Sequence, residues 1–442
     1  MNIQLSDHFS YGKLLRFSFP SIVMVIFTSI YSVVDGLFVA NFAGPTPFAA
    51  VNIVWPFIMI LGAIGFMFGS GGNALVAKTL GEGKKHKARQ IFSLLIYTTL
   101  AVGAIFSVIG LLLLKSMVGL FGVQGQLFID CLTYGRILFP AIPFLMLQVI
   151  FQSFMVTAER PKFGLTITVV AGLINFALDA WLIIGLRWGL AGAAWATAIS
   201  QFIGAVVPLM YFALPNKSLL GLGRTRFYAS ALIKTCTNGI SEFLSDISMS
   251  LVGMLYNYQL LRLVGESGVI AYGIISYVNF IFLAAFLGYS IGTNPIVSYH
   301  FGAQNKTELQ NLFGKSLCLI AAAAILLTGL AEITSESIAG IFVGYDEKLT
   351  SMTTYGFRIY ALSFLLAGFN IYASGFFTAL NNGLISAIIS VCRTMIFECL
   401  CVFILPVFWG LNGIWTAIIV AESLALVVSV TFFKRFRPHY GY

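Results

Sequence analysis

Residues 17–41 read FSFPSIVMVIFTSIYSVVDGLFVAN, an apolar run that contains one carboxylate, Asp35. A helix needs about 20 apolar residues to cross a membrane, so this run is long enough. An ionised side chain inside the hydrocarbon layer costs roughly 2.5–3.5 kcal/mol on insertion scales unless it faces a cavity or a partner. The stretch therefore predicts a transmembrane helix whose carboxylate is retained for a function.

The composition of the whole chain extends this interpretation. Of 442 residues, 59% are hydrophobic and only 9% are charged, whereas soluble domains carry about 25% charged residues. Apolar runs such as residues 91–114 are continuous and of helix length, without the alternation of an outer-membrane barrel. We therefore expect an all-α integral membrane protein. The polar N-terminus has no small-residue cleavage site, so we expect no cleaved signal peptide.

Twelve membrane spans with short connections fit the sequence. Their ranges are about 13–40, 48–77, 90–114, 126–157, 163–184, 190–213, 227–261, 269–298, 309–331, 349–378, 384–408 and 411–433. With both termini in the cytoplasm, most of the 25 Lys and Arg residues fall on the inner side, as the positive-inside rule requires. The net charge of +9 is thereby explained without a nucleic-acid partner. We expect a multi-pass protein of the cell (inner) membrane.

The two halves of the chain are related by an offset of 221 residues, half of its 442 residues. Landmarks coincide at this offset, among them Gly71 with Gly292 and Gly81 with Gly302. Because each half has an even number of spans, both halves insert in the same orientation, with a pseudo-two-fold axis along the membrane normal. We expect two six-helix lobes, residues 1–214 and 227–442, joined by a cytoplasmic linker, residues 215–226.

Polar residues of the first half predict an ion-coupling site. Tyr31 and Asp35 lie on one face of a helix, as do Asn175 and Asp179, and at about 1.5 Å per residue Thr197 lies at a similar depth. Two carboxylates, an amide and a hydroxyl suit a hard cation such as Na⁺, with Asp35, Asn175, Asp179 and Thr197 as ligands. They equally suit a shared proton. The alternative is that local hydrogen bonds satisfy each group separately.

Other polar groups within the spans are candidates for a drug cavity or for internal packing. Glu242 and Asp246 form a helical i,i+4 pair that either attracts cationic substrates or packs between helices. Gln148, Gln152 and Tyr134 are expected to line the interior of the first half. Glu398 lies one to two turns from Arg393, which predicts an ion pair.

Several motifs together resemble the multidrug and toxic compound extrusion (MATE) family, especially its bacterial MepA-like members. They are PSI at 20–22, VVDGLFVA at 33–40, GEGKK at 81–85, AERPK at 158–162, N-x-x-x-D at 175–179 and GLxGAAxAT at 189–197. The resemblance covers essentially the whole chain. It implies a V-shaped pair of six-helix bundles, with a coupling site at the positions of Tyr31, Asp35, Asn175, Asp179 and Thr197. Other members place coupling carboxylates in the seventh and tenth spans; span 349–378 has no carboxylate here, which speaks against that version, although Glu242 and Asp246 leave a role of the seventh span open.

The expected function is therefore secondary active efflux of organic cations and lipophilic drugs in exchange for Na⁺ or H⁺, by alternating access. We expect a monomer that needs no cofactor, and no enzyme, since no G-x-S-x-G or H-E-x-x-H motif is present. No G-x-x-x-x-G-K-[ST] motif for ATP binding occurs either, so an ion gradient must supply the energy. The alternative is a flippase or exporter of lipid-linked oligosaccharides with a related architecture.

Overall fold

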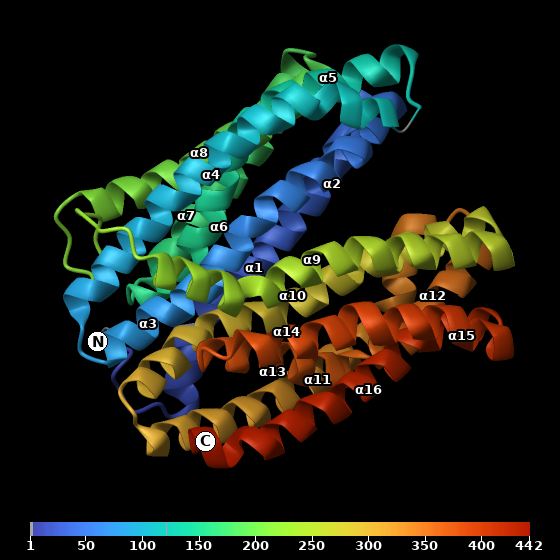
Figure 1. Cartoon of the computed structure of the whole chain (residues 1–442). Coiled ribbons are helices and arrows are strands. Elements are labelled where there is room, and N and C mark those ends of the chain that lie inside the picture. Colours follow the sequence, from blue (N-terminus) through green and yellow to red (C-terminus); the bar gives the residue numbers. More distant parts are fainter. Residues whose placement is uncertain (1–2, 121) are drawn as a thin grey trace.

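The computed structural model of the protein describes residues 3–120 and 122–442, and every regular element in these ranges is a helix (Figure 1). The regular elements in these ranges are all helices because the apolar segments are expected to lie in the hydrocarbon interior of a membrane. Hydrocarbon offers no hydrogen bonds, so backbone groups must be satisfied within each segment, and a helix does this.

The first half of the chain forms eight α-helices with π-helical or 3₁₀ turns between some of them. They are α1 (Tyr11–Phe38), η1 (Val39–Ala43), α2 (Pro45–Met67), η2 (Phe68–Gly72), α3 (Asn73–Gly81), α4 (Lys85–Leu120), α5 (Gly125–Leu138), η3 (Phe139–Ala141), α6 (Ile142–Thr157), α7 (Pro161–Asp179), η4 (Ala180–Gly185) and α8 (Gly189–Ala213).

The second half repeats this pattern. Its elements are α9 (Ala229–Val264), α10 (Glu266–Gly302), α11 (Lys306–Val343), α12 (Glu347–Ala361), α13 (Phe364–Ala379), α14 (Gly383–Val391), η5 (Cys392–Phe397), α15 (Glu398–Trp409) and α16 (Leu411–Tyr440).

The number of membrane crossings follows from joining the elements that continue one another. Within the described residues, 10 helical stretches are long and apolar enough to cross a membrane. α12 and α13, bent by 48° at their junction, make one further crossing. α9 is more polar because it carries Glu242 and Asp246, yet it is 36 residues long and packs between α2 and α10. With α9 there are twelve crossings, as the sequence predicts.

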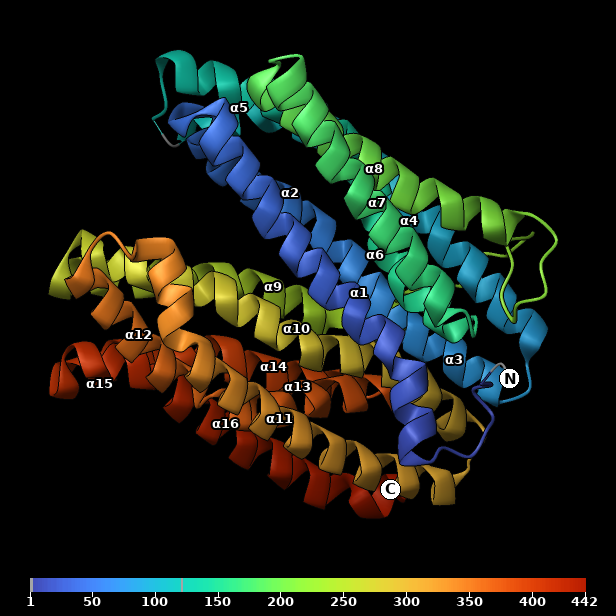
Figure 2. The same ribbon diagram turned by 180° about the vertical axis from the view of Figure 1, so that it is seen from behind.

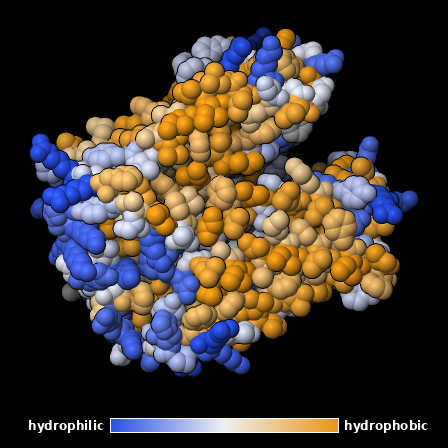
Figure 3. All heavy atoms as spheres, viewed as in Figure 1, coloured by the Kyte–Doolittle hydropathy of each residue, from blue (hydrophilic) through white to orange (hydrophobic). Residues whose placement is uncertain are grey.

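The helices form two bundles that meet at one end and separate at the other, giving a V (Figures 1 and 2). α1 packs along α10, and α2 with η2 packs along α9, so these helices join the lobes. Both chain termini lie at the closed end. Hydrophilic residues gather at the closed end and at the two tips, with a hydrophobic belt between them (Figure 3). This belt is the surface expected to face lipid.

Small residues let the two lobes approach at the closed end. A Cβ on Gly239 of α9 would overlap the carbonyl oxygen of Met67, and one on Gly71 would overlap the Gly239 backbone. Across the molecule, a Cβ on Gly292 of α10 would come within 2.8 Å of Ser18 of α1. The contact between Gly71 and Gly239 and the contact between Gly292 and Ser18 are equivalent in the two halves. The 221-residue offset relates Ser18 to Gly239 and Gly71 to Gly292. Such small residues allow backbones to pack closely in membranes.

A second contact crosses the pseudo-symmetry axis itself. A Cβ on Gly81 would overlap the carbonyl oxygen of Tyr299, and a Cβ on Gly302 would overlap that of Lys78. The same offset relates Lys78 to Tyr299 and Gly81 to Gly302, so each half makes the same contact with the other. The approximate two-fold axis therefore passes between the end of α3 and the end of α10.

Candidate functional site

Asp35 and Asp179 lie on neighbouring helices of the first lobe, where both helices change their winding. α1 packs along α7, which places the two residues on facing elements. α1 continues into the π-helical η1 shortly after Asp35, and η4 begins directly after Asp179. η1 and η4 also contact each other. π-helical turns inside helices occur frequently at functional sites because they displace side chains and leave backbone carbonyls less satisfied.

The two carboxyl groups lie within hydrogen-bonding reach of each other. Asp179 is 1% exposed, and Asp35 is partly exposed. The Oδ1 atoms of Asp35 and Asp179 are enclosed and have no hydrogen-bond partner in the described part of the chain. The same holds for the Nδ2 atom of the buried Asn175. Two adjacent carboxylates cannot both stay ionised and dry, so the pair either shares a proton or holds a cation. The unpartnered oxygens supply acceptors for either ion.

Two tyrosines accompany the carboxyl pair. Tyr31, one turn before Asp35 on α1, is near enough for its phenol to interact with that charge. Tyr134 of α5 is 2% exposed and lies near enough to both carboxyl groups to interact with them. The sequence interpretation placed Tyr134 in a drug cavity, and no local pattern links α5 to α1 and α7. Only the packing of the lobe shows its proximity to the pair.

Thr197 is 7% exposed on α8, which packs against α7. Its backbone carbonyl accepts a hydrogen bond from the hydroxyl of Ser200. Its helix therefore borders the helix that carries Asn175 and Asp179. Within the described residues, no group of three His, Cys, Asp or Glu side chains is arranged to hold a metal ion. The donor set at the pair is two carboxyls with amide and hydroxyl neighbours, and its chemistry fits a monovalent cation or a proton.

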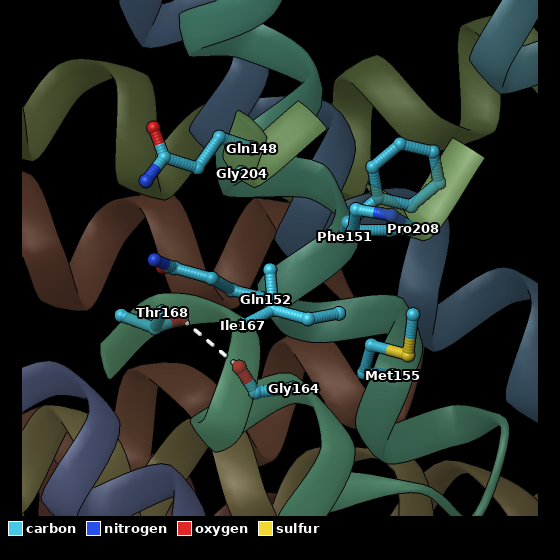
Figure 4. A pocket seen from close by; sticks show the side chains of 9 residues that line it. All are labelled: Gln148, Phe151, Gln152, Met155, Gly164, Ile167, Thr168, Gly204 and Pro208. Carbon is cyan, nitrogen blue, oxygen red and sulfur yellow. Dashed lines mark hydrogen bonds between the residues drawn. The ribbon is translucent and has the colours of Figure 1, made fainter. Parts of the chain in front are cut away.

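Gln148 and Gln152 of α6 line a small cavity inside the first lobe (Figure 4). The cavity measures about 10 Å³, which is the space for roughly one water molecule. Thr168 of α7 also lines it, but its hydroxyl donates to the Gly164 carbonyl at 3.1 Å. Pockets for drug-sized ligands measure about 300–1,000 Å³. In this conformation the two glutamines face a space for water rather than for a drug.

The second lobe contains an ion pair that differs from the sequence-based prediction. Nε of Arg393 lies 2.7 Å from Oε1 of Glu422, whereas Glu398 is only near enough to interact with the Arg393 charge. Asn370 donates to the other oxygen, Oε2, at 2.7 Å, and its own Oδ1 accepts from Ser429 at 2.8 Å. The predicted pair was wrong because α16 brings Glu422 to the π-helical turn that carries Arg393, a contact no spacing reveals. The Arg393 charge is therefore neutralised.

Glu242 and Asp246 lie half-buried on α9, the helix that packs against α2 of the other lobe. Glu242 is near enough to interact with Arg393, and Asp246 with Glu242. The structure thus joins Glu242 to the polar group around Arg393. It does not join either residue to the Asp35 and Asp179 pair, which belongs to the first lobe.

Comparison with known proteins gives consistent results. The family model MatE matches residues 20–181 and 243–404. The multidrug export protein MepA of Staphylococcus haemolyticus is 25% identical over 423 residues, covering 95% of this chain and 92% of the relative. The MepA protein of Staphylococcus aureus strain NCTC 8325 is 24% identical over 434 residues, with the same coverage of 95% and 92%.

Solved structures share the fold. A crystal structure of MATE in complex with MaL6 superposes with a TM-score of 0.93 at 19% identity, covering 98% of both chains. The outward-facing conformation of a multidrug resistance MATE family transporter of the MOP superfamily also gives 0.93 at 19% identity, covering 98% of this chain and 97% of that one. At this identity the likeness concerns the fold, two bundles of membrane helices.

Proposed function

This chain belongs to the MatE family and is a membrane transporter, and on that premise we propose that it exports organic cations and lipophilic drugs in exchange for Na⁺ or H⁺. The observation that carries the proposal is the enclosed pair of Asp35 and Asp179, whose unpartnered oxygens lie in one lobe of a V-shaped molecule. The curated relatives named as multidrug export proteins support the substrate class.

The mechanism we propose is alternating access driven by exchange at the carboxyl pair. A proton or Na⁺ that binds between Asp35 and Asp179 removes the repulsion between them and lets α1 and α7 close together. α1 also forms part of the joint with α10, so its movement is transmitted to the second lobe. Coupling requires that ion and drug prefer different states of the V, since a ligand shifts an equilibrium only by its differential affinity. Pro20, inside α1, provides a place where that helix can bend.

The topology is part of the proposal. The closed end of the V carries both termini and the basic linker, and by the positive-inside rule this supports our proposal that it lies in the cytoplasm and that the V opens outward. We assign residues 1–214 to the N-terminal lobe, 215–226 to the linker and 227–442 to the C-terminal lobe of a monomer in the cell membrane. A lipid-linked oligosaccharide flippase is disfavoured, because Arg393, an arginine in the middle of predicted span 384–408, is paired with Glu422.

Transport into inverted membrane vesicles tests the proposal. A fluorescent organic cation such as ethidium is supplied outside the vesicles, with a Na⁺ gradient and a proton gradient imposed in separate experiments. We expect uptake with one of the two gradients, and none with either gradient in the Asp35→Asn variant. The variant Glu336→Gln, an exposed carboxylate on α11, is the matched control and should transport normally. Uptake that needs neither gradient, or that survives Asp35→Asn, would overturn the assignment.

A further inference from the structure

A cavity of about 500 Å³ lies between the segment that follows α8 and the first turns of α4, and its lining contains neither Asp35 nor Asp179. Its size is within the range of small-ligand sites, about 300–1,000 Å³. Its lining comprises His86, Arg89, Gln90, Ser93, Phe212, Ala213, Leu214, Pro215, Asn216, Leu220, Gly221, Leu222, Gly223 and Arg224.

Hydrogen bonds to α4 hold the segment that forms one side of the cavity. The hydroxyl of Thr225 donates to the Gln90 carbonyl at 2.7 Å, and the Gly223 backbone N–H donates to the Ser93 hydroxyl at 3.1 Å. Leu220 is fully buried beneath the segment. In Figure 1 this segment runs beside the start of α4 at the closed end of the V. The linker is therefore a fixed wall of the cavity.

The ionisable residues of the lining all have basic side chains. They are His86, Arg89 and Arg224, and the lining contains no Asp or Glu. Arg89 uses two of its N–H groups on the carbonyl oxygens of Leu219 and Ser218, at 3.0 and 3.3 Å. A guanidinium has five N–H donors, so further donors remain for a ligand. A lining whose ionisable side chains are all basic favours an anionic ligand.

Beside the polar Gln90, Ser93 and Asn216, the lining has an apolar part. Phe212 lies in the last turn of α8, Leu214 and Pro215 follow that helix directly, and Leu214 is 60% exposed. α4 begins at Lys85 and α8 ends at Ala213, so the cavity lies where these two membrane-crossing helices end on the same side of the molecule. A ligand that fits must carry an anionic head beside apolar groups.

We propose that this cavity binds the phosphate group of an anionic phospholipid. Basic pockets between membrane helices on the cytoplasmic side bind acidic headgroups in this way. Arg89 and Arg224 would contact the phosphate, and the wall formed by Leu214 and Pro215 would contact the start of the acyl chains. Because the linker forms one wall, a bound lipid holds the connection between the two lobes against α4.

Binding of short-chain lipids to the purified full-length protein tests the proposal. Delipidated protein is titrated with dioctanoyl phosphatidylglycerol, with zwitterionic dioctanoyl phosphatidylcholine and with glycerol 3-phosphate, and adducts are counted by native mass spectrometry. We expect binding of the anionic lipid only. The double variant His86→Gln/Arg224→Gln should bind it about fivefold or more weakly, as expected for the loss of at least one basic side chain.

A matched control separates this site from general attraction to basic surfaces. The double variant Lys434→Gln/Arg435→Gln removes two basic side chains at the end of α16, outside the cavity, and should bind the anionic lipid like the wild type. Equal binding by the His86/Arg224 variant and the wild type would overturn the proposed site. Equal binding of phosphatidylcholine would overturn the selectivity for anions. Binding of glycerol 3-phosphate as tight as that of the lipid would show that a soluble phosphate ester is the ligand.

Discussion

Glu159 and Glu308 belong to different lobes, yet both hold the same short segment that precedes α1. Oε1 of Glu159, in the turn between α6 and α7, accepts the Leu5 backbone N–H at 2.7 Å. Oε1 of Glu308, on α11, accepts the Phe9 backbone N–H at 2.9 Å. Leu5 and Phe9 are fully buried. The N-terminal segment therefore ties the two lobes together at the closed end of the V.

Replacing Glu308 with Ala should destabilise the closed end. The change leaves the Phe9 backbone N–H and the Asn311 amide without this acceptor, and it removes the contact with His8 at 2.6 Å. An unsatisfied buried donor costs about 1–3 kcal/mol, so the melting temperature in detergent should fall. Glu336→Ala, an exposed position on the same helix, is the control and should melt like the wild type. Equal melting of both variants would contradict the tie.

We expect Glu159 to make the stability of the folded protein depend on pH. Burial raises the pKa of Glu159 above its ordinary 4.5, although the hydrogen bond from the Leu5 N–H opposes the rise. A raised pKa in the folded state means that folding favours the protonated acid. This stabilisation is complete below about pH 4.5 and is lost as the pH rises through the folded-state pKa.

The variant Glu159→Gln keeps an oxygen acceptor for Leu5 but cannot ionise. Relative to the wild type, its melting temperature should therefore rise as the pH increases above about 4.5. Melting curves at several pH values in one detergent provide the measurement. A constant difference between the two proteins across that range would show that Glu159 does not cause the effect.

Gly239 should be intolerant of any side chain, because a Cβ there would overlap the Met67 backbone of the other lobe. Gly239→Ala should force the closed end apart, lower the melting temperature and impair efflux. Gly253→Ala on the same helix has no atom within 4 Å of the added Cβ and is the matched control. Alanine in an exposed helix position is about 1 kcal/mol more favourable than glycine, so the control should be neutral or slightly stabilised. Normal stability of Gly239→Ala would contradict the close approach.

Asp35→Asn and Asp179→Asn should each abolish drug export while the protein remains folded in the membrane. If the two carboxyl groups act as one unit, the double variant should be no worse than either single variant. Drug resistance of cells that express each variant, compared at equal membrane abundance, gives the measurement. Additive partial losses would instead indicate two independent groups.

The pair formed by Arg393 and Glu422 should be required for stability in a non-additive way. Arg393→Met leaves Glu422 as an uncompensated charge that is 2% exposed, and breaking a buried ion pair costs about 3–5 kcal/mol. The double variant Arg393→Met/Glu422→Gln removes both charges and should recover much of the lost stability. Folded yield and melting temperature of the wild type, Arg393→Met, Glu422→Gln and the double variant form the required cycle. No recovery in the double variant would show that the charge pairing is not the cause.

Some structural features could be predicted from the sequence, and others could not. Eleven crossings follow from long apolar runs, counting α12 and α13 as one, whereas α9 is too polar to be recognised by composition alone. The pairing of Arg393 could not be predicted, because Glu398 is close in the sequence whereas Glu422 is brought near by α16. The N-terminal segment also gave no signal, since its contacts with Glu159 and Glu308 connect residues more than a hundred positions apart.

The sequence by itself determined that the protein is helical, spans the membrane and is built from two related halves. These properties depend on local composition and on periodicity, and the membrane enforces them on each segment separately. Asp35 stood out for the same reason, as a carboxylate within an apolar run. The sequence also grouped Asp179 with it, but only the tertiary structure shows that Tyr134 of α5, a helix that packs on α2 and α8, is near enough to interact with both carboxyl groups. Proximity between helices depends on how whole lobes pack, which no single stretch of the chain contains.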